Sequence, residues 1–290
     1  MNAGLDRRGL AAALSAFFIW GLSPIFFKAL GWMSAAEIVS QRVLWSVPLL
    51  AGWLALSQGF GGVRTALRSP RLLGLLCITT LCTGGNWLLY VWAVVHGRTV
   101  EASLGYFINP LLNVALGALV LRERLRPLQW LAVAMACVGV AGRVLTLGHL
   151  PWIALAVAGT FGAYGLLRKQ APIDAVNGLF IETVIALPIA IGYLLWAASN
   201  GVQHPPADAL HWLMLPAAGL ITTVPLALFA TGARRLPLST LGLAQYLAPT
   251  LQFLCAILVL GEALAPGELW SFACIWVGLA VYSWDTFRRR

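Results

Sequence analysis

The chain has 290 residues, of which 60% are hydrophobic and 10% charged, and its formal net charge is +9. Soluble domains carry about 25% charged residues, so this composition excludes a soluble globular protein. The positive charge does not indicate nucleic-acid binding, because the basic residues lie in short connections and form no face with interleaved aromatic residues. The sequence therefore predicts one all-α integral membrane unit.

Apolar runs that can each cross a bilayer recur along the whole chain. Reading them between charged and turn-forming residues predicts ten transmembrane helices. The expected spans cover residues 9–29, 36–56, 72–95, 101–121, 127–146, 151–168, 176–198, 209–231, 239–260 and 267–285. The first run is too long for a cleaved signal peptide, and nine further spans follow it.

The basic residues alternate between the two sides of these spans. Fifteen of the 19 lysines and arginines lie before the first span, after the tenth, or after the second, fourth, sixth and eighth. On the other side only Lys28 and Arg98 lie near span ends, while Arg42 and Arg143 lie within spans. Since loops rich in Lys and Arg stay in the cytoplasm, both termini are predicted to be cytoplasmic.

The five cysteines all fall inside predicted spans, and the four histidines are scattered over span ends and loops. There is no CxxC motif and no Cys/His cluster in the sequence. These patterns predict no metal site, no disulfide framework and no cofactor.

Among the charged residues inside spans, Arg42 in the second and Glu182 in the seventh hold equivalent positions and are the main candidates for a functional charge. A charge at the centre of a membrane helix costs about 2.5–3.5 kcal/mol on insertion scales, so it persists only beside a partner or water. Arg42 is expected to pair with Glu37 or Glu101. Glu182 has no basic residue in its own span, so it is expected to be protonated and to couple transport to protons. The alternative for Glu182 is a structural carboxyl bonded to a neighbouring helix.

Polar side chains at helical spacing predict a substrate-lining face in the third and fourth spans. In the third span this face is formed by Thr79, Thr83, Asn86 and Tyr90, with Trp87 beside them. In the fourth it is formed by Tyr106, Asn109 and Asn113, and Pro110 leaves the Tyr106 carbonyl group without its helical donor. The alternative is that the asparagines only tie neighbouring helices together.

Further candidates for the substrate site occur in three other spans: Trp20 and Ser23 in the first, Tyr164 in the sixth, and Gln245 and Tyr246 in the ninth. Aromatic residues in spans serve more often in packing or at the membrane interface. Small residues predict close contacts between helices, namely Gly84, Gly85, Ala132, Ala136, Gly139 and Gly278.

The chain also contains an internal repeat. The segment YFINPLLNVALGALVLRERLRP from Tyr106 resembles YLAPTLQFLCAILVLGEALAP from Tyr246. With one gap, Arg42 aligns with Glu182. Residues 1–147 and 148–290 are thus predicted to be two five-helix repeats, inverted because five is odd. Inversion places Arg42 and Glu182 in opposite halves of the membrane, so no salt bridge between them is expected.

These segments carry a family resemblance. EASLGYFINPL, GGNWLLYVWAV and AQYLAPTLQFL, together with the five-plus-five duplication, resemble the drug/metabolite transporter superfamily with its EamA-type repeats over essentially the whole chain. The resemblance implies ten helices around a central cavity and a permease of the bacterial inner (plasma) membrane. It implies no particular substrate.

The function predicted from the sequence is a secondary transporter or exporter of small amphipathic metabolites or drugs, not an enzyme. Its expected partners are this small-molecule substrate and membrane lipid, and the sequence assigns no oligomeric state. One alternative is a lipid-carrier flippase, which would need a large lateral opening between helices. The other is a membrane enzyme on lipid substrates, which would need acids or histidines clustered at one membrane face.

Overall fold

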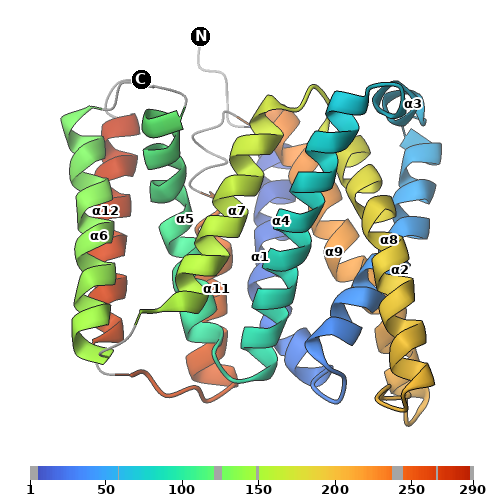
Figure 1. Cartoon of the computed structure of the whole chain (residues 1–290). Coiled ribbons are helices and arrows are strands. Elements are labelled where there is room, and N and C mark those ends of the chain that lie inside the picture. Colours follow the sequence, from blue (N-terminus) through green and yellow to red (C-terminus); the bar gives the residue numbers. More distant parts are fainter. Residues whose placement is uncertain are drawn as a thin grey trace.

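The computed structural model describes residues 6–57, 59–120, 126–147, 150–236, 244–265 and 267–287. Across these residues the chain is helical and contains no strand (Figure 1). Its helices are α1 (Arg7–Ala29), α2 (Ala35–Ser57), α3 (Gly61–Leu67), α4 (Pro70–Val95), α5 (Thr99–Val120), α6 (Pro127–Leu147), α7 (Trp152–Gln170), α8 (Ala175–Ser199), α9 (Ala209–Arg235), α11 (Leu247–Leu254), the π-helical turn η1 (Cys255–Val259) and α12 (Glu268–Phe287).

Each predicted span overlaps a helix, and the ninth overlaps α11 and η1. The short α3 was not predicted. Among the described residues, α1, α2, α4, α8 and α9 are long and apolar enough to cross a membrane. Shorter apolar helices cover 127–142, 152–168 and 247–259. The all-α fold is confirmed for the described residues and is consistent with a membrane protein, while ten crossings in two inverted repeats remain a prediction.

Local sequence signals set the helix ends. Asp6, Ser69, Asp174 and Asp208 are N-cap residues whose side chains accept hydrogen bonds from backbone N–H groups in the first turns of α1, α4, α8 and α9. Gly97 and Gly201, just after α4 and α8, have φ of +68° and +66°. Only glycine adopts such values without strain, so these two positions terminate their helices.

Most helix packing joins the two halves of the chain. α1 packs against α9 and α11, α2 against α8 and α9, α4 against α7 and α8, and α5 against α7. α6 and α12 lie side by side as a separate pair beside α5 (Figure 1). The core is therefore shared between the halves and is not divided between them.

The glycines of α6 and α12 allow these helices to approach closely. A Cβ atom on Gly139 would lie 2.9 Å from the Ser271 carbonyl oxygen, and one on Gly278 would lie 2.9 Å from that of Ala132. The predicted contacts are confirmed there. They are wrong for Gly84 and Gly85, where a Cβ atom would meet nothing within 4 Å. These glycines lie on faces of α4 that turn away from its polar face.

Apolar side chains on α4 bracket its polar segment. Leu72 and Leu76 belong to a buried cluster with residues of α2, α3 and α8. Val91 and Val94, beyond the polar segment, belong to a second cluster with residues of α1, α2, α5, α7 and α9. The polar residues of α4 thus lie between two hydrophobic layers.

Candidate functional site

The polar faces of α4 and α7 face each other. Thr79, Thr83, Asn86 and Tyr90 are all at most 9% exposed, so the predicted face of α4 is buried on one side of the helix. On α7, Thr160, Tyr164 and Arg168 follow one another at intervals of four and lie on one face. Thr160 and Arg168 were not predicted as site residues.

Asn86 joins α4 to two other helices. Its Nδ2 atom donates to the Val157 carbonyl oxygen at 3.0 Å and to Thr160 Oγ1 at 3.1 Å. The Tyr106 hydroxyl of α5 donates to Asn86 Oδ1 at 2.8 Å. The Tyr106 ring also contacts the Tyr90 ring, with centroids 5.5 Å apart.

Tyr90 extends this arrangement to α1, because its hydroxyl lies 3.1 Å from Ser23 Oγ. We call Ser23, Asn86, Tyr90, Tyr106 and Thr160 the Asn86 network. It connects α1, α4, α5 and α7. Four of its members, Ser23, Asn86, Tyr90 and Tyr106, were predicted from the sequence as site candidates in three different spans. The structure brings those candidates together.

Arg42 lies in a mainly aromatic environment. Its side chain is buried, and Nε donates to Thr222 Oγ1 of α9 at 3.0 Å. The guanidinium carbon lies 4.5 Å from the Trp87 ring centroid and 4.9 Å from that of Phe27. Within the described part of the chain, Nη1 is buried and has no hydrogen-bond partner.

The predicted pairing of Arg42 with Glu37 or Glu101 is wrong, because both acids bind other groups. Glu37 accepts from the backbone N–H groups of Ser34 and His204, both at 2.8 Å, and its Oε2 lies 2.8 Å from His204 Nδ1. Glu101 accepts from Arg98 Nη2 at 2.6 Å and from the Ile153 N–H at 3.1 Å. Backbone N–H groups at helix starts lack intrahelical partners and attract such carboxylates.

Glu182 is held by two neighbouring helices. Thr79 Oγ1 donates to Oε1 at 2.6 Å, and the Tyr164 hydroxyl donates to Oε2 at 3.3 Å. Arg168 Nε lies 3.7 Å from Oε1. We call Thr79, Tyr164, Arg168 and Glu182 the Glu182 cluster. The hydrogen bonds to neighbouring helices that the sequence left as an alternative are present.

The expectation that Glu182 lacks a basic partner is wrong, because α7 continues past the apolar run to Gln170 and brings Arg168 to the carboxylate. The Arg168 side chain is only 12% exposed and is not a loop residue in water. A Cβ atom on Gly178 would overlap the Arg168 guanidinium group. A larger residue at position 178 would therefore displace the Arg168 guanidinium group from its present position.

The Glu182 cluster and the Asn86 network lie one after the other between α4 and α7, and we call this line of buried polar side chains the polar path. Thr79 and Asn86 are seven residues apart on α4, which corresponds to about 10 Å along a helix. Thr83 lies between them, and its buried Oγ1 has no hydrogen-bond partner in the described structure. From α7, Tyr164 contacts Glu182 at one end of this path and Thr160 contacts Asn86 at the other. The path combines hydroxyl, amide and phenol groups with one ion pair.

The remaining candidates lie away from these two polar groups. The Trp20 ring packs against Phe17 and Phe229, with centroids 5.8 and 6.0 Å away. Tyr246 packs on an apolar cluster of α5, α6, α11 and α12. Large aromatic side chains gain most from such packing.

The amide candidates Asn109, in α5, and Gln245, which precedes α11, have different environments. Asn109 is 5% exposed, and its Oδ1 lacks a hydrogen-bond partner among the described residues. Gln245 is half-buried just before α11. The side chain of Asn113 lies outside the described residues.

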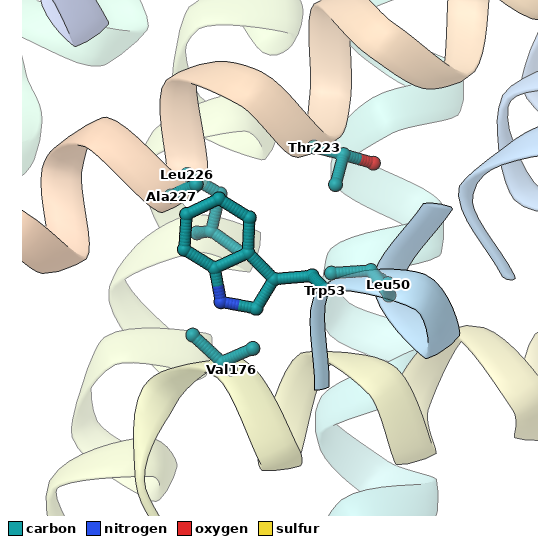
Figure 2. Close-up of a pocket in the computed structure, with 6 residues that line it drawn as sticks. All are labelled: Leu50, Trp53, Val176, Thr223, Leu226 and Ala227. Carbon is teal, nitrogen blue, oxygen red and sulfur yellow. The ribbon is translucent and has the colours of Figure 1, made fainter. Parts of the chain in front are cut away.

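Two openings in the described surface lie away from the Asn86 network. Figure 2 shows an apolar crevice between α2, α8 and α9, which is lined by Trp53 among others and admits no water-sized sphere. A cavity of about 540 Å³ lies where α1 meets α2 and α4 ends, and Trp32, Trp92, His96 and His204 contribute to its lining. The central cavity implied by the family resemblance is neither of these.

Comparison with known proteins identifies the family. Residues 7–145 and 150–284 each match the EamA-like transporter family. The chain belongs to the EamA-like transporter family. This membership supports a multi-pass membrane transporter and not an enzyme.

Relatives of this EamA-like chain cover almost its whole length. It is 43% identical to protein RarD of Escherichia coli K12, over 98% of this chain and 97% of that protein. It is 48% identical to an "uncharacterized transporter" of Vibrio cholerae, over 96% and 93%. It is 32% identical to the "chloramphenicol-sensitive protein RarD" of Pseudomonas aeruginosa, over 98% and 96%. These relatives are bacterial proteins.

A solved structure titled "Crystal structure of protein" is similar to this EamA-like chain with a TM-score of 0.60. The similarity covers 94% of this chain and 96% of that chain at 22% sequence identity. At this identity the likeness shows the fold alone.

Proposed function

We propose that this EamA-like chain is a secondary transporter that moves small amphipathic metabolites or drugs by alternating access. The observation that carries the proposal is the buried polar path between α4 and α7, which lies where the two halves of the chain pack together. Buried polar groups are normally fully hydrogen-bonded, yet Thr83 Oγ1 and Asn109 Oδ1 lack partners in the described structure. Such groups suit a site that exchanges water and substrate.

The pattern of helix contacts supports two equivalent repeats. If α1, α2, α4 and α5 correspond to α7, α8, α9 and α11, then the packing of α1 on α9 mirrors that of α7 on α4. The packing of α1 on α11 likewise mirrors that of α7 on α5, and α6 pairs with its own equivalent, α12. We infer that residues 1–147 and 148–290 are inverted repeats around the path, in an inner membrane with both termini cytoplasmic.

The flippase alternative has less support. A flippase needs a lateral opening wide enough for a lipid headgroup, whereas the crevice in Figure 2 admits no water-sized sphere. The enzyme alternative needs clustered acids or histidines. Within the described part of the chain, no group of three or more His, Cys, Asp or Glu residues could hold a metal ion.

The proposed transport is tested by comparing metabolites in cells that lack or overproduce the protein, followed by transport of the affected compounds in proteoliposomes. We expect accumulation to change for small molecules that are partly aromatic or zwitterionic, because the path offers phenol, indole and amide groups with few charges. Transport restricted to polyanions such as nucleotide sugars would contradict the proposal.

The Glu182 cluster leads to a prediction about pH. The groups that face this buried carboxyl are Thr79 from α4 and Tyr164 and Arg168 from α7. A conformational change that separates Arg168 from Glu182 removes the charge that stabilises the carboxylate, so proton uptake accompanies it. We expect wild-type transport in proteoliposomes to vary with pH and Glu182→Gln to lose this dependence while inserting normally. Asp208→Asn, at a carboxylate 60% exposed, is the control. An unchanged profile in Glu182→Gln would leave Glu182 with a structural role alone.

A further inference from the structure

Arg42 is a buried cation without an acidic partner in the described structure. It is 6% exposed and forms none of the salt bridges there. The two acids expected to pair with it bind other groups, and Glu182 has Arg168. Removing a charge from water costs several kcal/mol unless a counter-charge compensates it.

The contacts that Arg42 does make leave this charge uncompensated. Thr222 is a neutral acceptor for Nε, and the Phe27 and Trp87 rings attract a cation without neutralising it. The Nη1 atom is completely buried with no acceptor in the described residues. A guanidinium group with unused donors is suited to a carboxylate, which accepts two parallel hydrogen bonds from such a group.

The aromatic residues near Arg42 indicate what the rest of the ligand is like. Phe27 contacts the Tyr90 ring at 6.1 Å, and Tyr90 contacts the Tyr106 ring at 5.5 Å. Arg42, which lies over the Trp87 ring, is therefore linked through the Phe27 ring to the Asn86 network. A flat apolar group bound beside Trp87 would place its charged end at Arg42. One guanidinium balances one negative charge, which favours a monoanion over a dianion such as a phosphate monoester.

We propose that Arg42 binds the carboxylate of the transported molecule and that the rings around it bind the apolar part. The substrate is then a small organic carboxylate, either a monoanion or a zwitterion, with a flat apolar group. This inference rests on the proposed transport function and adds the substrate class.

Binding of three matched probes to the purified full-length protein tests the charge preference. Phenylacetate, phenylacetamide and phenethylammonium share a phenyl ring and differ in charge, and calorimetry gives their affinities. Hydrogen bonds to charged groups contribute about 1.5–3 kcal/mol, so phenylacetate should bind roughly 10- to 100-fold more tightly than the amide. Arg42→Gln should remove this difference by weakening phenylacetate alone. Arg126→Gln, at an arginine 46% exposed and paired with Asp285, should leave it intact.

The unliganded protein provides a second readout. An uncompensated buried charge destabilises the fold, so Arg42→Met should unfold in detergent at the wild-type temperature or above it. A structural Arg42 would instead give a clear fall in unfolding temperature, and that result would overturn the proposal.

The outcomes separate the two proposals. Equal binding of all three probes, binding of none, or unchanged phenylacetate binding in Arg42→Gln would each overturn the carboxylate assignment, whatever transport assays with cell metabolites show. Binding of phenylacetate that depends on Arg42, without transport of any small molecule in proteoliposomes, would support the assignment and count against the transport function.

Discussion

Replacing Arg168 by glutamine is expected to lower the free energy of unfolding by about 3–5 kcal/mol. The substitution removes the cation 3.7 Å from Glu182 and leaves a carboxyl that is 2% exposed without its counter-charge. Because Arg168 itself is 12% exposed, we expect a value near the lower end of this range. Unfolding of the purified protein in detergent, followed by denaturant or temperature, measures the effect.

A double substitution and a matched arginine serve as controls for this prediction. Arg168→Gln combined with Glu182→Gln should recover much of the stability, because neither charge then remains in the core. Arg235→Gln removes an ion pair of 3.6 Å with Asp6 that is exposed on both sides, and it should change the free energy of unfolding much less. Equal losses for Arg168→Gln and Arg235→Gln would show that the Glu182 cluster is not a buried ion pair.

Asn86→Ala is expected to abolish transport and to lower the free energy of unfolding by about 1–3 kcal/mol. The substitution leaves the Tyr106 hydroxyl without its acceptor and removes the bonds to Val157 and Thr160. Since Asn86 and Tyr106 share one hydrogen bond, Asn86→Ala and Tyr106→Phe should be clearly non-additive. Unfolding and proteoliposome transport are measured on all three variants.

Asn109→Ala is the matched control, because Asn109 is also a buried asparagine but its Oδ1 has no hydrogen-bond partner in the described structure. It should retain near wild-type stability. A loss in Asn109→Ala as large as that in Asn86→Ala would contradict the distinction drawn between these two residues.

Helix positions could be predicted from the sequence because the length and apolar content of a span are local properties. The same holds for the polar face of α4, since the spacing of Thr79, Asn86 and Tyr90 already places them together. The seven-residue α3 lacked such a signal because it is too short to form a span.

Side-chain contacts between different helices could not be predicted from the sequence, because the residues that form them are far apart along the chain. Thr222 and Arg42 are 180 residues apart, and Thr79 and Glu182 are 103 residues apart. Arg168 follows an apolar run and therefore resembles a loop residue, although its long side chain reaches back to Glu182. Thr160 was missed because threonines in apolar helices commonly bond to their own backbone. Thr160 does donate to the Ala156 carbonyl oxygen at 2.6 Å, and it also accepts from Asn86.

Alternating access to the path between α4 and α7 is the central claim, and Thr83 is the residue that tests it most directly. Thr83 lies between the Glu182 cluster and the Asn86 network and is 9% exposed. In a variant without the five native cysteines, Thr83→Cys can be treated with a membrane-impermeant thiol reagent in vesicles of either orientation. Leu81→Cys is the control, because Leu81 is 68% exposed on the surface of α4 and is expected to contact lipid there. If access alternates, Thr83→Cys should be modified from both sides of the membrane, whereas Leu81→Cys should be modified little. Protection of Thr83→Cys from either side would contradict it.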